Sequence, residues 1–63
     1  MADFERLLKH IIDSDGKPSE SDVLDAGYSI ENFMRITQLN KNPAKLVKNA
    51  RNELLARGIH YKE

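Results

Sequence analysis

Residues 42–58 read NPAKLVKNARNELLARG, and this stretch has the clearest helix start and stop signals in the sequence. Pro43 lacks a backbone N–H and its φ is already helical, so it favours the first helical position after an Asn42 N-cap. Gly58 can adopt the left-handed conformation just beyond the helix end, and Arg57 places positive charge in the last turn. We therefore predict a helix from Pro43 to Arg57.

The predicted helix has one apolar face and one polar face. Apolar side chains recur at helical spacing on the first face: Pro43, Leu46, Val47, Ala50 and Leu54. The opposite face carries Lys45, Lys48, Asn49 and Asn52, with Arg51 on its flank and Glu53 to the side. Lysine contacts phosphates and asparagine can pair with adenine, so this face is suited to DNA. A solvated surface helix would show the same pattern.

A first helix is predicted near residues 4–14, with Asp3 as its N-cap and Gly16 as its stop. Its apolar residues follow the helical pattern without a miss: Phe4, Leu7, Leu8, Ile11 and Ile12. His10 lies off this apolar stripe, and we expect it to be exposed.

Two shorter helices are predicted between these, near residues 20–26 and 30–39. Ser19 precedes the first of them, and Asp22 stands in the reciprocal position of a capping box. Gly27 ends that helix, and Ser29 caps the next one.

The four predicted helices indicate an all-α fold, a compact four-helix bundle that forms a single domain over residues 1–63. After Gly58, the residues Ile59, His60 and Tyr61 could form a short strand or a frayed tail. The expected core comprises Phe4, Leu7, Leu8, Ile11, Ile12, Val23, Leu24, Ile30, Phe33, Met34, Leu46, Val47, Ala50 and Leu54. A chain of this length buries only about 60% of its unfolded surface, so we expect modest stability.

Composition narrows the class of protein. Cysteine is absent, which excludes a disulfide framework, a thiolate nucleophile and a zinc–cysteine site. No apolar run approaches the roughly 18 residues of a membrane span, and the first residues do not resemble a signal peptide. We expect a cytoplasmic protein without membrane contact.

Catalytic and metal-binding patterns are also weak. Residues 13–17 resemble part of a calcium loop, but Ile11 would occupy its first ligand position and Pro18 would interrupt it. Neither histidine has a second ligand at metal spacing, and no nucleophile constellation or phosphate loop occurs. We expect no catalytic residue, no metal site and no cofactor.

Net charge is zero, but its distribution along the sequence is uneven. Residues 1–34 contain three basic and eight acidic side chains, whereas residues 35–63 contain seven basic and two acidic ones. The fold is therefore expected to have an acidic and a basic side. The basic side could bind a polyanion, or the acidic and basic halves of the chain could attract each other.

The segment ITQLNKNPAKLVKNARNELLARGIHY resembles the second half of a winged-helix or related helix-turn-helix DNA-binding domain, over about residues 29–61. A recognition helix in that family often closes with leucine, a basic residue and glycine before a strand. Leu54, Arg57 and Gly58 occupy those positions here. The resemblance implies a small regulator of the kind that phages carry, with its wing reduced or absent. The turn over residues 40–42 lacks the usual glycine.

A second helix-turn-helix frame exists. Residues 25–29, DAGYS, resemble the turn of a helix-turn-helix motif, in which glycine is followed by serine. In this frame the helix over 30–39 would be the recognition helix. Its solvent side offers Glu31, Asn32, Arg35 and Gln38, with little net positive charge. Because neutralisation of phosphates dominates the affinity for DNA, we favour the helix over 43–57 as the recognition helix.

The leading hypothesis is a DNA-binding transcriptional regulator that binds double-stranded DNA, with a possible homodimer because one small module binds weakly. The expected contacts are Lys41, Lys45, Lys48, Asn49, Arg51, Asn52 and Lys62. The alternative is a protein-interaction module that binds part of the transcription machinery or another regulator without reading DNA. The acidic N-terminal half favours that alternative, with Leu55 and Tyr61 as candidate contacts.

Overall fold

The computed structural model describes residues 2–38 and 42–62, and these residues form an all-α fold. Its helices are α1 (Phe4–Asp13), α2 (Glu20–Asp25), α3 (Ile30–Thr37) and α4 (Pro43–Ala56). The predicted helix positions are confirmed, with ends that differ by one or two residues. None of the described helices combines the length and the apolar character that crossing a membrane requires.

Each helix begins at the N-cap that the sequence indicates. The side chains of Asp3, Ser19, Ser29 and Asn42 accept hydrogen bonds from backbone N–H groups in the first turns of their helices. Asp22 also accepts from the backbone N–H of Ser19 at 3.2 Å, which completes the capping box. These bonds satisfy donors that have no partner inside the helix, so the helix starts are fixed locally.

The helices α2 and α4 end in the same hydrogen-bonded motif. After α4, the N–H of Gly58 donates to Leu55 and the N–H of Ile59 donates to Leu54, both at 2.9 Å. This is a Schellman motif, with Gly58 at φ +76° and a half-buried isoleucine after it. The α2 end repeats the pattern with Gly27 and Tyr28.

The end of α1 differs from the prediction of a simple glycine stop. Asp15 takes the left-handed position with φ +56°, and Gly16 follows with φ +84°. Gly16 is buried, and its α-carbon lies against the backbone of Pro43. The turn after α1 therefore abuts the first residue of α4, a contact between segments that are distant in sequence.

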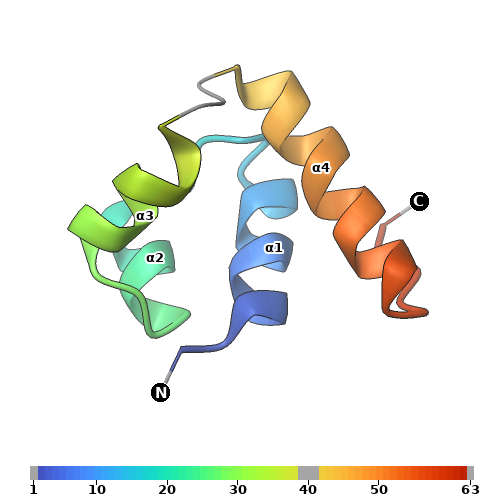
Figure 1. Ribbon diagram of the computed structural model, residues 1–63, viewed down its shortest axis with the longest axis horizontal. Helices are drawn as coiled ribbons and strands as arrows, with labels where there is room; N and C mark the ends of the chain where they lie inside the picture. The colour runs from blue at the N-terminus through green and yellow to red at the C-terminus, as the bar shows by residue number, and fades with distance from the viewer. Residues whose placement is uncertain (1, 39–41, 63) are drawn as a thin grey trace.

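The helices are arranged around α1. Figure 1 shows α1 in the middle, with α4 on one side and the α2–α3 pair on the other. The main packing contacts run from α1 to α4, from α1 to α2, and from α2 to α3. The helices α3 and α4 thus pack on different partners and do not lie along each other.

The core forms where α1 meets its neighbours. Its buried residues are Leu7, Leu8, Ile11, Ile12, Ala26, Ala50 and Leu54. Val23 is also buried, with 1% of its surface exposed. Half-buried Phe4, Phe33, Leu46 and Val47 pack against this cluster. The predicted core is confirmed in α1 and α4.

Two predicted core residues are wrong. Leu24 is 59% exposed and Met34 is 64% exposed. The reason is tertiary. The helix α2 has only six residues and packs through Val23, with the following Ala26 also buried, while α3 packs mainly on α2 and reaches the core cluster through Phe33. Among the described residues no further layer covers the outer side of α3, so its apolar residues are not all buried.

The possible strand after α4 is also wrong. Residues 59–62 form no strand with any described segment. A strand needs an extended partner to accept its backbone hydrogen bonds, and the described chain supplies only helices and turns. Ile59 and Tyr61 instead pack their side chains against the core cluster.

Replacement of glycines tests the contact between the α1 turn and α4. Gly16→Ala and Gly58→Ala both place a side chain at positive φ, which costs about 1–2 kcal/mol. At Gly16 the added Cβ would also overlap the Pro43 backbone, whereas at Gly58 it meets nothing within 4 Å. We expect Gly16→Ala to cost a further ~1–3 kcal/mol in urea unfolding. Equal losses for the two variants would contradict this packing.

Truncation of two leucines tests the corrected core. Leu54 is 1% exposed, so Leu54→Ala should lower the free energy of unfolding by about 2–5 kcal/mol. Leu24→Ala removes a largely exposed side chain and should change stability by no more than about 0.5 kcal/mol. Thermal unfolding followed by circular dichroism measures both. A large loss for Leu24→Ala would show that α2 is packed differently.

Candidate nucleic-acid interface

The outer face of α4 carries the polar residues that the sequence singled out. Lys45, Lys48, Asn49, Arg51 and Asn52 are all exposed. The opposite side of the same helix holds buried Ala50 and Leu54. Packing of that apolar side on α1 therefore orients the polar face outward, along one edge of the molecule (Figure 1).

These five side chains have no partner among the residues that the structure describes. Within the described residues, none of them makes a hydrogen bond or an ion pair with another side chain. Four basic residues elsewhere in the described chain differ, because acidic side chains pair with Arg6, Arg35, Arg57 and Lys62. The charge on the α4 face is therefore not offset by direct contacts and is directed to solvent.

Helical spacing divides the face into parts. Lys45, Lys48 and Asn52 follow i, i+3, i+7 spacing and share one stripe. Asn49 lies toward α3, where it lines a groove, and Arg51 lies on the other flank of the stripe. The face thus presents two lysines and one asparagine along its centre, with one further polar residue on each side.

The structure places Lys62 apart from the α4 face. Its ammonium group lies 2.6 Å from Asp13 Oδ1, at the end of α1, and 5.5 Å from the centre of the Tyr61 ring. The Tyr61 hydroxyl donates to the same carboxylate at 2.9 Å. Lys62 therefore fastens the tail to α1. Lys41, the remaining predicted contact, lies outside the described residues.

A groove separates α3 from α4. Its floor is the apolar stripe of α1, with Leu7, Leu8 and Ile11 among the lining residues. Ile36 from α3 and Leu46 from α4 form part of its walls. Its volume is about 150 Å³, which is the size of a cavity that holds a benzene ring. The groove exists because α3 and α4 pack on different helices.

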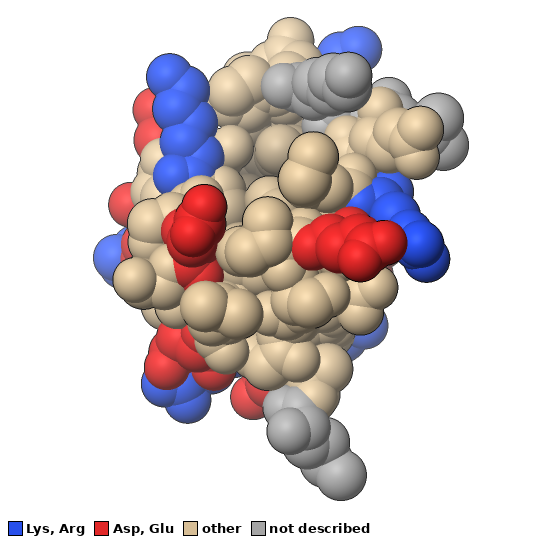
Figure 2. Space-filling view, turned by 90° about the vertical axis from the view of Figure 1, so that its left-hand side faces the viewer, with Lys and Arg blue, Asp and Glu red and all other residues tan. Residues whose placement is uncertain are grey.

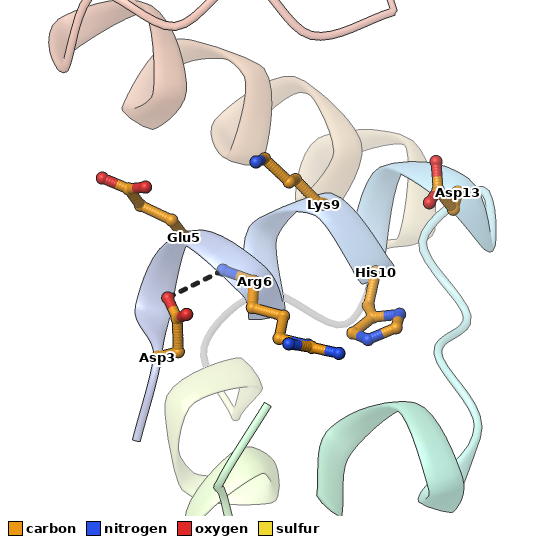
Figure 3. A pocket seen from close by; sticks show the side chains of 6 residues that line it. All are labelled: Asp3, Glu5, Arg6, Lys9, His10 and Asp13. Atoms are coloured by element: carbon orange, nitrogen blue, oxygen red, sulfur yellow. Dashed lines mark hydrogen bonds between the residues drawn. The ribbon is translucent and has the colours of Figure 1, made fainter. Parts of the chain in front are cut away.

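The exposed side of α1 carries a mixed-charge surface that includes Arg6 and His10. Figure 3 shows these two side chains pointing toward α2, while Lys9 points the other way. Arg6 Nε and His10 Nε2 lie 2.7 and 2.8 Å from Asp25 Oδ2. These hydrogen bonds, that from His10 first, hold the pKa of Asp25 below its ordinary value.

The expected exposure of His10 is therefore wrong, because its side chain is only 25% exposed and is engaged with α2. Its Nδ1 also faces Asp22 at 3.6 Å. Sequence patterns gave no signal for this contact, since His10 and Asp25 belong to different helices. The contact joins α1 to α2, and within the described residues no group of three histidine, cysteine or acidic side chains is arranged to hold a metal.

Comparison with known proteins does not identify a family for this chain. No family model, no curated protein and no solved structure matches this chain. What defines the candidate site is therefore its geometry and charge alone.

Acidification tests the contact between the tail and α1. The hydrogen bond from Lys62, with a smaller one from Tyr61, holds the pKa of Asp13 below its ordinary value, although slight burial opposes this. A lowered pKa means that the contact stabilises the fold above about pH 4 and is lost as the pH falls through the folded-state value. We expect the NMR signals of the Tyr61 ring to move toward those of free tyrosine as the pH falls below about 4 and Asp13 becomes protonated.

Asp13→Asn is the matched control for this titration, because it removes the carboxylate charge without acid. We expect its Tyr61 signals to be displaced already at neutral pH and to change little on acidification. Wild-type signals that stay constant into strong acid would contradict the contact.

Proposed function

We propose that this chain is a small DNA-binding regulator whose α4 contacts double-stranded DNA. The observation that carries the proposal is the set of three α4 cations, Lys45, Lys48 and Arg51, without any acidic partner among the described residues. Cations that neutralise phosphates supply most of the affinity for DNA. Asn49 and Asn52 beside them provide the amide groups that can pair with base edges.

The charge along α4 favours its N-terminal half as the part that enters the major groove. Residues 43–52 carry basic side chains and no acid, and the helix N-terminus adds a partial positive charge. In the C-terminal part, Glu53 pairs with Arg57 at 3.0 Å, and Leu55 is 43% exposed. The major groove of B-DNA is wide enough, at about 12 Å, to admit one helix.

A helix-turn-helix architecture is part of the proposal. The pair α2–α3 packs together across a short turn that contains Gly27, as the two helices of such a motif do. The exposed side of α3, however, has its one cation paired, because Arg35 contacts Glu31 at 3.1 Å. Charge therefore favours α4 as the DNA-contacting helix, while the packed pair of α2 and α3 supports it from the other side of α1.

A second candidate function is binding to another protein without reading DNA. The groove between α3 and α4 favours it, because its apolar floor accepts a single large apolar side chain. Ile36 at the groove is 50% exposed, so a partner would bury additional apolar surface there. Random duplex DNA at low salt distinguishes the two functions, since only the first predicts binding.

Lysine replacement tests the DNA proposal. Lys48→Ala removes one cation from the α4 face and should weaken binding to all duplex sequences by a similar factor. The slope of log affinity against log salt should fall in magnitude by about one, because one phosphate contact is lost. Fluorescence anisotropy with labelled duplexes at several salt concentrations measures both quantities.

Lys17→Ala is the matched control, because it removes the same charge from the exposed turn between α1 and α2. We expect it to bind with the affinity and salt slope of the parent. If Lys17→Ala and Lys48→Ala behave alike, or if the parent does not bind duplex DNA at low salt, α4 is not a DNA contact.

A further inference from the structure

Most of the large exposed apolar residues belong to α2 and α3. Leu24 in α2, and Met34 and Ile36 in α3, are each at least half exposed. Figure 2 shows the face on which α2 and α3 lie, where uncharged residues cover much of the surface and acidic side chains also point toward the viewer. Met34, the most exposed of them at 64%, lies on the outer side of α3, whereas Ile36 borders the groove beside α4.

The outer stripe of α3 combines one apolar residue with two opposite charges. Glu31, Met34, Arg35 and Gln38 line a shallow hollow along this helix. The carboxylate of Glu31 and the guanidinium of Arg35 are one turn apart, and their side chains are 77% and 72% exposed. An ion pair this exposed is weak and is readily exchanged for contacts with another molecule.

We propose that this stripe of α3 pairs with the same stripe of a second copy of the chain. In an antiparallel two-fold arrangement, Glu31 of each copy faces Arg35 of the other, because the order of the charges is reversed. The two Met34 side chains then lie between the ion pairs and cover each other. Such an isologous contact uses one surface patch twice and closes after two copies.

Charge complementarity indicates that the partner of this stripe is a second copy of the chain. A stripe with an acid and a base one turn apart is complementary to its own antiparallel image, and the chain as a whole has zero net charge. Two copies therefore meet without net repulsion. One helix of eight residues makes a small interface, so the dimer is weak and depends on concentration.

The proposed dimer does not depend on the proposed binding of DNA. The helices α3 and α4 lie on opposite sides of α1, so pairing through α3 leaves the α4 face of both copies accessible (Figure 1). Two linked α4 helices would raise the apparent affinity for a DNA with two sites. Loss of the dimer, however, leaves binding of one copy to a single site intact, so the two proposals fail separately.

Charge reversal tests the proposal by sedimentation velocity over a series of concentrations. Glu31→Arg gives copies that face each other with arginines, and Arg35→Glu gives copies that face each other with glutamates. We expect each variant alone to dimerise at least about tenfold more weakly than the parent. A mixture of the two variants restores both cross-copy ion pairs and should form a heterodimer.

The heterodimer is the decisive result, because a change in the stability of α3 within one chain does not produce it. Met34→Glu should also abolish the dimer, whereas Leu55→Glu, at an exposed leucine of α4, should leave it unchanged. Circular dichroism confirms that each variant keeps its helices. A parent that stays monomeric up to about millimolar concentration, or a mixture without heterodimer, would overturn the proposal.

Discussion

The packing of α4 on α1 is the contact on which the rest of the structure depends. Leu7 of α1 and Leu54 of α4 are almost completely buried in the same cluster, and α1 contributes half or more of that cluster. The turn at Gly16 fits against Pro43 and fixes where α4 begins relative to α1. In a domain of this size one such interface supplies a large part of the buried apolar surface.

The packing of α4 on α1 also determines which side chains of α4 are exposed to solvent. Because α4 is held through its apolar side, its lysines and asparagines are exposed and pair with no other side chain of the described residues. The α2–α3 pair is held differently: besides Val23 and Ala26, polar contacts from Arg6 and His10 to Asp25 join it to α1. The acids of the N-terminal half are thus partly neutralised within the fold, whereas the bases of α4 are not.

The sequence by itself determined the helices and the residues at which they begin. Capping is a local interaction, so Asn42 with Pro43, and Ser19 with Asp22, could be assigned from neighbouring residues alone. The apolar periodicity of α1 and α4 was long and regular enough to predict their buried faces. The polar face of α4 followed from the same periodicity, because it is the face opposite the core.

The tertiary structure alone decided which apolar residues are covered. Leu24 and Met34 have the spacing of core residues, but burial needs a neighbouring element, and no described segment lies over the outer side of α3. The contact between His10 and Asp25, the position of Lys62 beside Asp13, and the groove between α3 and α4 each join residues from separate elements. Periodicity reports which face of a helix is apolar, whereas the partner of that face depends on how the helices pack in space.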